Sequence, residues 1–443
     1  MKKTKTISLI LVCILITTML FGCSKKSDQG NYTGKEMSIM NLTAAELISP
    51  RDAGQNPEAQ VAAKGANDFA FALSSLLAEE AGDNNLVCSP FSVWLPLAAL
   101  LNATDETNKP ALLSALGASG ITEEDINNAA SRMLFNLTKL ENKEYMDDFH
   151  NPIKIANAIF VDKSVTLKKE FAQTFLDYYR GSAINVDFSS SDAVGKVNQW
   201  ASDNTEGLIT NVIEEFDPET IAAIANAIYY SDRWDWEFNP DKTKEGDFNG
   251  LSGVDKANFM IREGDAQTYY EDDKVQAMPL SFANGGGLYI ILPKDGDATK
   301  CLSDMTSDYF SEIQNDSIQA TGKLLLPRFT IQGGVMDLSD SLQKMGVPLF
   351  DSDSAPLTGG IIEEDLKVWV NQAVQKAMIK VNEEGTTAAA VTVLAMAGAG
   401  MPLPTEPFEM ICDKPFVFVL YDWTYDGSSQ VLFTGVVNQV AEE

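Results

Sequence analysis

The sequence predicts an α+β fold, in a chain long enough for one large domain or two to three ordinary ones. Helical patterns come first, strands are mixed in, and strand patterns dominate toward the C-terminus. Strands and helices do not alternate regularly, which disfavours a doubly wound parallel sheet. The 443 residues are 45% hydrophobic and 22% charged, a composition typical of a globular protein with a sizeable core.

The first residues have the pattern of a targeting segment. Three lysines precede the apolar run Ile7–Phe21, which is short for a membrane span. The run leads into Leu20-Phe21-Gly22-Cys23, which resembles the cleavage box of bacterial lipoproteins. We therefore expect residues 1–22 to be a signal peptide and Cys23 to carry the lipid. An ordinary signal peptide with a chance cysteine is the alternative.

The N-terminus also predicts the organisation of the chain. Residues 23–60 are polar at first and show little periodicity, so we expect a membrane tether. Residues 61–443 would then form the domain, lipid-anchored on the extracellular face of a bacterial membrane. The net charge of −30, from 33 basic and 63 acidic residues, repels phosphate backbones and excludes a nucleic-acid partner.

Side chains suited to catalysis or metal binding are few. His150 is the only histidine, which excludes a multi-histidine metal site and leaves no second base for a serine–histidine triad. With residues 1–22 removed and Cys23 acylated, three of the five cysteines remain, so at most one disulfide forms, and Cys88 is expected to be a buried thiol. Acidic pairs such as Glu383-Glu384 are typical of solvated surfaces. We expect no enzyme activity, metal or cofactor.

Periodicity and local signals predict the elements in order. Helical spacing begins at Ala62, Ser89 is placed to cap a helix that Pro90 opens, and Gly346 closes another. The run Asn284-Gly285-Gly286-Gly287 predicts a tight turn. The remaining predicted helices are Lys109–Leu116, Glu123–Leu140, Leu167–Tyr179, Ala193–Ile213 and Leu338–Met345, and the predicted strands are Ile155–Val161, Ile184–Phe188, Leu288–Pro293, Leu324–Ile331 and Met378–Val381.

The stretch Val381–Pro402 has mixed preferences. After two carboxylates and Gly385 it consists of small residues, with no charge until Glu406. Its alanines favour helix, its Val-Thr-Val favours strand, and its last glycines and Pro402 favour an exposed loop. Such a segment suits a part that changes state. A flexible linker between two strands is the other interpretation.

Several motifs resemble those of the serpins, the serine-protease-inhibitor family. The run E-E-G-T-T-A-A-A resembles their mobile hinge, and its residues are Glu383, Glu384, Gly385, Thr386, Thr387, Ala388, Ala389 and Ala390. The other motifs that match in order are Asn85–Val93, Val197–Ala201, Asn204–Ile209, Asn226–Tyr230 with Trp234, Ser354–Gly360, Lys414–Phe418 and Leu432–Asn438. The resemblance implies a serpin fold over residues 61–443, with three β-sheets, about nine helices and an exposed reactive-centre loop.

The resemblance also implies a mechanism. A protease cuts the loop and is held as an acyl-enzyme while the freed hinge inserts into the main sheet as an extra strand. An inserting strand must be free of proline and charge, and Thr386–Ala397 meets both conditions. On alternation, the small residues Thr386, Ala388, Ala390 and Thr392 would face inward.

The family's supporting residues carry over by position. Ser89, Ser92 and Asn226 match the polar cluster where the central strands part, and Gln375 stands where the family often has histidine. Trp234 matches the tryptophan at the top of the sheet. Arg328 and Glu383 match a charge pair that ties the hinge to the neighbouring strand.

Family spacing places the reactive bond at Ala399–Gly400, fourteen residues after Gly385, with Met396 or Met401 as alternatives because the loop is somewhat long. Small residues there favour an elastase-like or subtilisin-like target.

We therefore expect a monomeric suicide-substrate inhibitor of an extracellular serine or cysteine protease, and the acidic surface argues against a heparin-type activator. A non-inhibitory serpin acting as a surface binding or chaperone-like module is the alternative, although such loops tend to carry proline or charge. A hydrolytic lipoprotein enzyme is disfavoured by the single histidine.

Overall fold

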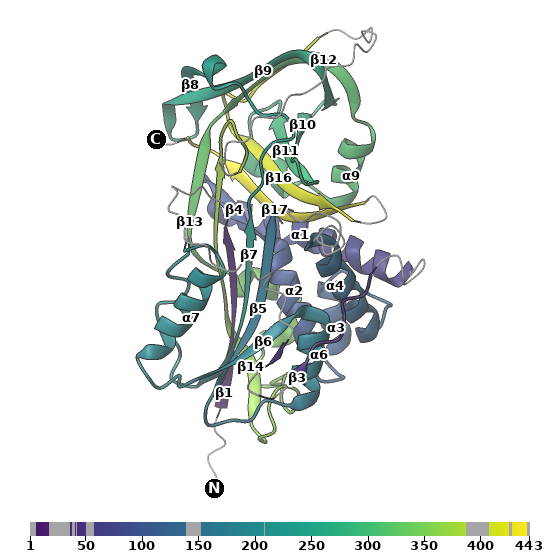
Figure 1. The fold of residues 1–443 in the computed structure, drawn as a ribbon, viewed down its shortest axis with the longest axis vertical. Helices are drawn as coiled ribbons and strands as arrows, with labels where there is room; N and C mark the ends of the chain where they lie inside the picture. The colour runs from purple at the N-terminus through teal and green to yellow at the C-terminus, as the bar shows by residue number, and fades with distance from the viewer. Residues whose placement is uncertain are drawn as a thin grey trace.

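The computed structural model describes residues 6–16, 36–37, 40, 42–49, 57–138, 152–207, 209–386, 407–424 and 428–440. The α-helices are α1 (Pro57–Ala81), α2 (Pro90–Leu101), α3 (Lys109–Ala115), α4 (Glu123–Leu137), α6 (Lys169–Tyr179), α7 (Asp192–Asp203), α8 (Ala298–Ser303), α9 (Ser307–Asn315) and α10 (Ser339–Lys344). The described residues thus contain nine α-helices and form three sheets, which confirms the α+β class, the three sheets and the number of helices expected from the sequence (Figure 1).

The main sheet has six strands in the order β13-β14-β1-β7-β5-β6. Their bounds are β13 (Phe329–Asp337), β14 (Lys367–Val381), β1 (Thr6–Ile16), β7 (Thr220–Tyr230), β5 (Ile153–Asp162) and β6 (Gly181–Val186). The first strand of the chain, β1, therefore lies at the centre of the sheet and runs parallel to both β14 and β7 (Figure 1). We call its place between β7 and β14 the central strand position.

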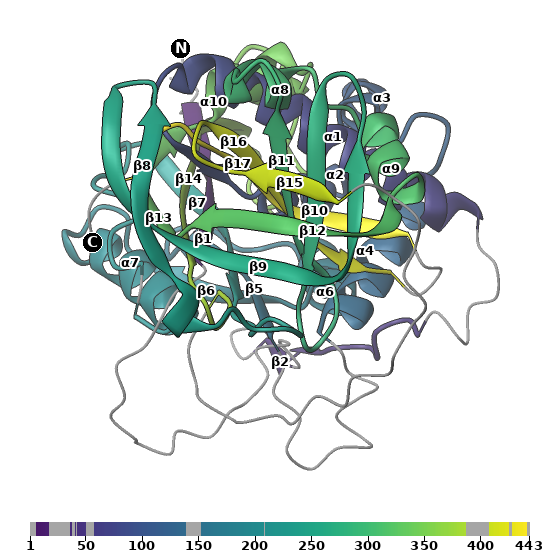
Figure 2. The ribbon, with the colours of Figure 1, turned by 90° about the horizontal axis from the view of Figure 1, so that it is seen from above.

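A second sheet forms the upper part of the molecule in Figure 1 and lies across the view in Figure 2. Its path is β15-β12-β9-β10-β11-β16-β17-β4, with β8 paired to β9, and β2 and β3 form a separate pair. The bounds are β2 (Glu36–Met37), β3 (Leu42–Thr43), β4 (Leu86–Cys88), β8 (Lys244–Gly250), β9 (Gly253–Glu271), β10 (Val275–Ser281), β11 (Gly287–Pro293), β12 (Ile318–Pro327), β15 (Phe408–Ile411), β16 (Phe416–Trp423) and β17 (Ser429–Val437).

The two faces of the main sheet carry different side chains. Alternate residues of β5 and β7 face α7 and are mostly alanines, as at Ala158, Ala223 and Ala225. Their neighbours, such as Ile159 and Ile224, face the larger core that contains α1, α2, α4 and α6. Strands buried on both faces read as continuous apolar runs, which is the pattern of β7. The small face lets α7 lie close against the sheet.

The single strand predicted over Leu324–Ile331 is wrong, because the structure has two strands there. β12 ends at Pro327 and pairs with β9, whereas β13 begins at Phe329 and pairs with β14. Arg328 lies between them, and its backbone N–H donates to Asn258 O at 2.8 Å. Proline has no N–H to continue a ladder, so the chain changes sheets at this point. The change places the Arg328 side chain beside the end of β14.

The helix predicted over Ala193–Ile213 is also too long, since α7 ends at Asp203. The Asn204 amide donates to Trp200 O at 2.7 Å, and Thr205 Oγ1 donates to Ala201 O at 2.6 Å, so side chains occupy the last free carbonyls. Gly207 follows with a φ of 80°, which ends the helix as a left-handed residue does. Helix α1 begins at Pro57, five residues before the start predicted at Ala62, and the remaining predicted helices agree with the structure within three residues at the ends that were predicted.

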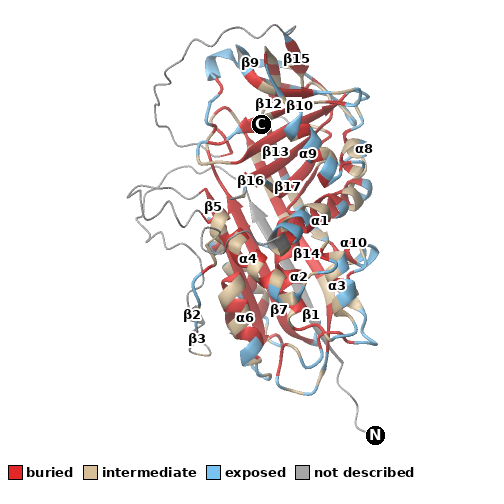
Figure 3. Cartoon of the chain, turned by 90° about the vertical axis from the view of Figure 1, so that its right-hand side faces the viewer, coloured by how far each residue is buried: buried red, intermediate tan, exposed pale blue. Residues whose placement is uncertain are grey.

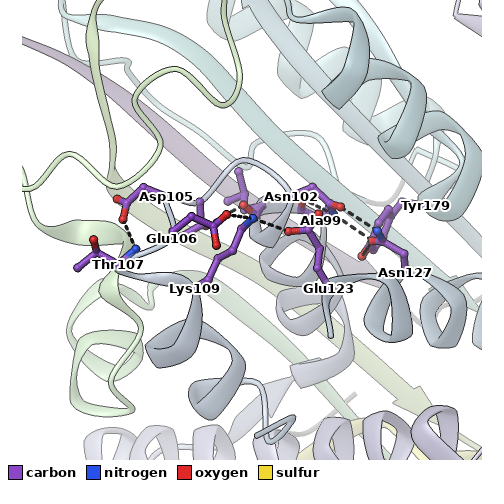
Figure 4. A network of polar contacts seen from close by, with 11 residues as sticks. Ala99, Asn102, Asp105, Glu106, Thr107, Lys109, Glu123, Asn127 and Tyr179 are labelled. Carbon is purple, nitrogen blue, oxygen red and sulfur yellow. Dashed lines mark hydrogen bonds and ion pairs between the residues drawn. The ribbon is translucent and has the colours of Figure 1, made fainter. Parts of the chain in front are cut away.

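Polar side chains connect the helices behind the main sheet (Figure 4). Tyr179 Oη donates to Asn127 Oδ1 at 2.7 Å, and Asn127 exchanges hydrogen bonds with Asn102. Tyr179 O accepts from Asn157 Nδ2 on β5 at 2.6 Å, so the network reaches the sheet. The buried hydrogen bonds fix the spacing of α2, α4 and α6 against β5.

Burial follows the sheets and the helix faces that cover them (Figure 3). Part of the predicted tether also packs on the domain, since Leu42 and Leu47 are buried and Ile48 N donates to Ser131 Oγ at 2.9 Å. The division of the chain at residues 22 and 60 stays a prediction. None of the described helices combines the length and apolar character needed to cross a membrane.

Candidate functional site at the base of the hinge

The chain turns back on itself directly after β14. Asn382 Oδ1 accepts from Glu384 N at 3.1 Å and from Gly385 N at 3.2 Å, and Asn382 N donates to Gly385 O at 3.2 Å. Asparagine favours such local turns because its side chain imitates a backbone acceptor. The turn brings Gly385 and Thr386 next to the residues that follow β7.

Gly385 makes a close backbone approach to that end. It forms an antiparallel bridge with Arg233 and has a φ of 145°. A Cβ at this position would lie 2.4 Å from Asp232 O and 2.6 Å from Arg233 Cα. Only glycine accepts both the conformation and the contact without a shift.

Thr386 continues the pairing and is fully buried. Its N–H donates to Asp232 O at 2.9 Å, and its Oγ1 is 3.1 Å from both Asp232 N and Asp232 O. Thr386 is thus already seated at the top of the central strand position. The remaining hinge residues Thr387, Ala388, Ala389 and Ala390 and the predicted reactive bond Ala399–Gly400 lie outside the described residues.

The structure brings Arg328 and Glu383 together in a two-pronged ion pair. Arg328 Nε lies 3.0 and 2.8 Å from the two carboxylate oxygens, and Nη2 lies 2.7 Å from Oε1. Thr243 Oγ1 also donates to this carboxylate. Burial would raise the pKa of Glu383, but the hydrogen bonds from Arg328 and Thr243 outweigh it and hold the pKa below its usual value.

Trp234 donates two hydrogen bonds to the turn that follows β14. Its indole Nε1 donates to Asn382 O and its backbone N to Glu384 O, both at 2.9 Å. Its ring stacks on Phe282 with centroids 4.8 Å apart. The predicted residues Trp234, Arg328 and Glu383 therefore all contact the hinge base.

Lower in the sheet, the predicted polar residues fall into two groups. Ser89 and Gln375 exchange hydrogen bonds, with Ser89 N to Gln375 Oε1 at 3.0 Å and Gln375 Nε2 to Ser89 O at 2.8 Å. Ser89 Oγ caps α2 by accepting from Ser92 N at 3.3 Å, as the sequence predicts. Asn226 on β7 bonds instead to Asn157, with its Nδ2 2.8 Å from Asn157 Oδ1.

Strand β1 separates the two groups, because Cys13 is registered against both Gln375 and Asn226. The buried oxygens Ser92 Oγ and Asn226 Oδ1 have no hydrogen-bond partner in the described part of the chain. Buried polar atoms are rarely left in this state. The unsatisfied Asn226 Oδ1 lies on β7, level with Cys13 of β1, and the unsatisfied Ser92 Oγ lies in the first turn of α2.

Asp232 is a site residue that the sequence analysis did not select. It is 3% exposed, and its carboxylate accepts from Asn284 N, Asn284 Nδ2 and Arg233 N at 2.8–3.1 Å. Burial raises its pKa to about 6 despite these bonds, and the nearby Asp422 adds to the increase. Its sequence signal is an acid placed two residues after an unbroken apolar strand.

The contacts of this site hold the backbone at the base of the hinge in place. Among the residues that the structure describes, no three His, Cys, Asp or Glu side chains are placed to hold a metal ion together. The described cysteines Cys88, Cys301 and Cys412 are free thiols, and burial raises the pKa of Cys88 to about 11. The site holds the base of the hinge beside the central strand position.

Comparison with known proteins decides the family. The model of the serpin (serine protease inhibitor) family matches residues 64–440. The chain belongs to the serpin family. Its relatives include alpha-1-antiproteinase of Rattus norvegicus, 26% identical over 388 residues that cover 86% of this chain and 90% of that protein. Serine protease inhibitor A3K of Mus musculus is 28% identical, covering 91% and 93%.

Solved structures show the same serpin fold. Tengpin, a thermophilic serpin in its native state, has a TM-score of 0.75 at 22% identity and covers 90% of this chain and 98% of its own. Human thyroxine-binding globulin has a TM-score of 0.73 at 22% identity, covering 87% and 100%. Both likenesses concern the fold.

The buried carboxyl of Asp232 predicts a pH-dependent cost in this serpin. Its folded pKa of about 6 exceeds the ordinary 3.8, so the folded state keeps a proton that the unfolded chain loses between about pH 4 and 6. The charge therefore costs stability above about pH 6, and the cost vanishes below about pH 4. Asp232→Asn should gain up to about 2–3 kcal/mol over the wild type as the pH rises from 4 to 7.

Urea unfolding of both proteins across this pH range measures the difference. Asp235→Asn, on an exposed residue of the same segment, is the matched control for removing a carboxylate. A difference between Asp232→Asn and the wild type that stays constant from pH 4 to 7 would contradict the assignment.

Proposed function

We propose that the exported form of this serpin is a suicide-substrate inhibitor that traps a protease by inserting its cleaved hinge into the main sheet. The observation that carries the proposal is the seating of Thr386, which pairs with Asp232 at the entrance to the central strand position. Insertion would then extend a ladder that has already started.

The register of this start predicts the rest of the strand. Gly385 is bridged antiparallel to Arg233, so each later hinge residue would face the preceding residue of β7. Ala390 then falls opposite Ile228. A new strand of about ten residues adds on the order of ten hydrogen bonds of roughly 0.5–1.5 kcal/mol each. Ordering the strand costs about 1–2 kcal/mol per residue, which is of the same order, so the net gain must come from burying the inward side chains together with these hydrogen bonds.

The relatives support inhibition over simple binding. Alpha-1-antiproteinase and serine protease inhibitor A3K carry the inhibitory role in their names. The structural neighbour thyroxine-binding globulin is named for binding, so the fold alone does not decide. A segment Thr386–Ala397 without proline or charge favours the inhibitor.

The inward-facing positions of the hinge provide a test of insertion. Ala390 has the same parity as the buried Thr386, whereas Ala389 has the opposite parity. Ala390→Arg would force a charge into the sheet and should turn the inhibitor into a substrate, with covalent complex reduced at least tenfold. The matched control Ala389→Arg should form complex like the wild type. Denaturing electrophoresis after incubation with subtilisin measures both.

Equal complex formation by the two arginine variants would rule out insertion in this register. A second readout is thermal unfolding before and after the loop is nicked. The exported form, residues 23–443, should gain stability through the new strand, and the same form carrying Ala390→Arg should not. No gain in the unaltered exported form would favour the non-inhibitory alternative.

We further propose that Ala399–Gly400 is the reactive bond and that the target has a shallow apolar specificity pocket. The loop carries no Arg or Lys between Lys380 and Lys414, so trypsin should be a poor target. Mass spectrometry of the fragment released by an elastase-like protease should locate the cut at Ala399. A cut outside Met396–Met401 would contradict both the spacing and the specificity.

The lipid anchor at Cys23 is proposed from the sequence, because this residue lies outside the described part of the chain. Cys23→Ala should move the protein from the detergent phase to the aqueous phase in a partitioning experiment. If the variant partitions like the wild type, the anchor is not at Cys23.

A further inference from the structure

We propose that the N-terminal segment Thr6–Ile16, while it remains attached, keeps this serpin from inhibiting by occupying the strand position that the hinge must enter. The inference rests on the proposed function and concerns its regulation. It comes from the place of β1 at the centre of the main sheet.

The pairing of β1 is extensive on both sides. Residues Thr6 to Ile14 are registered against β14, and residues Ser8 to Ile16 are registered against β7. Both ladders are parallel, with one irregularity in each. The backbone edges of β7 and β14 that face each other are thus both in use.

The hinge and β1 compete for the same residues of β7. Ile16 lies opposite Tyr229, and Ser8 lies opposite Thr220. Continued antiparallel from the Gly385–Arg233 bridge, the hinge would place Ala389 opposite Tyr229 and Gly398 opposite Thr220. A strand edge pairs with one partner at a time, so the two segments exclude each other.

The composition of β1 suits the position that it fills. Its sequence, TISLILVCILI, has neither charge nor proline across eleven residues. These are the conditions that an inserted hinge must also meet, because the backbone joins a ladder and alternate side chains enter the core. The segment that targets the chain for export thus also satisfies the demands of the sheet.

An unsatisfied polar atom lies next to the central strand position. Asn226, which is registered against Cys13, has a buried Oδ1 that finds no hydrogen-bond partner among the described residues. Removal of residues 1–22 would let β7 and β14 close or admit the hinge. Inhibition would therefore begin only after the leader is cut off, which would spare proteases in the compartment of synthesis.

The test compares residues 1–443 with residues 23–443, both translated without membranes. With subtilisin, the shorter chain should form the covalent complex, and the full chain should form less than a tenth as much. Nicking the loop should raise the unfolding midpoint of the shorter chain and leave that of the full chain unchanged. Equal complex formation by the two chains would overturn the inference.

Variants of the full chain test whether β1 is the segment that blocks complex formation. Val12→Pro removes a backbone donor in the middle of β1, where Val12 is registered against Val374 and Ala225, and should restore complex formation at least fivefold. Thr4→Pro, outside the bounds of β1, is the matched control and should restore nothing. If both variants behave like the unaltered full chain, the block does not come from this strand.

Hydrogen exchange of the full chain tests the occupancy without reference to inhibition. The amides of Thr6–Ile16 should exchange at least a hundredfold more slowly than in the free peptide, and Val12→Pro should abolish this protection. Unprotected amides would overturn the inference. If residues 23–443 form no complex while the leader amides are protected, the proposed inhibitory function fails and the occupancy stands.

Discussion

The pairing of the facing edges of β7 and β14 is the constraint on which the rest of the structure depends. Two long buried strands present backbone N–H and C=O groups to each other, and such groups must be paired in a core. In this structure β1 pairs with both edges. The hinge is the other segment of suitable composition, and its described end at Thr386 is bonded to Asp232, just beyond the end of β7.

The base of the hinge is held by several independent contacts. The ion pair of Arg328 with Glu383, the indole of Trp234 and the backbone of Asp232 hold the turn between Asn382 and Thr386. A buried ion pair adds little net stability, but breaking one partner away from it is costly. Its contribution here is to fix the direction in which a freed loop would enter the sheet.

Buried polar side chains lie on both sides of the central strand position. Ser89 and Gln375 satisfy each other on the β14 side, and Asn226 bonds to Asn157 on the β7 side. The latter contact continues through Tyr179 into the helices behind the sheet (Figure 4). These hydrogen bonds connect β14 to the start of α2 and β7 to β5.

The sequence by itself determined the α+β class, the cap of α2 at Ser89 and the hinge composition, because these follow from local periodicity, turn chemistry and the absence of charge. Contacts between distant segments decided the rest. Only the tertiary structure shows that Pro327 and Phe329 belong to different sheets, that Asp232 is buried beside Thr386, and that Thr6–Ile16 lies between β7 and β14. The apolar composition of a segment predicts that it is buried. The strands with which it pairs depend on which backbone edges remain unpaired when the sheet forms.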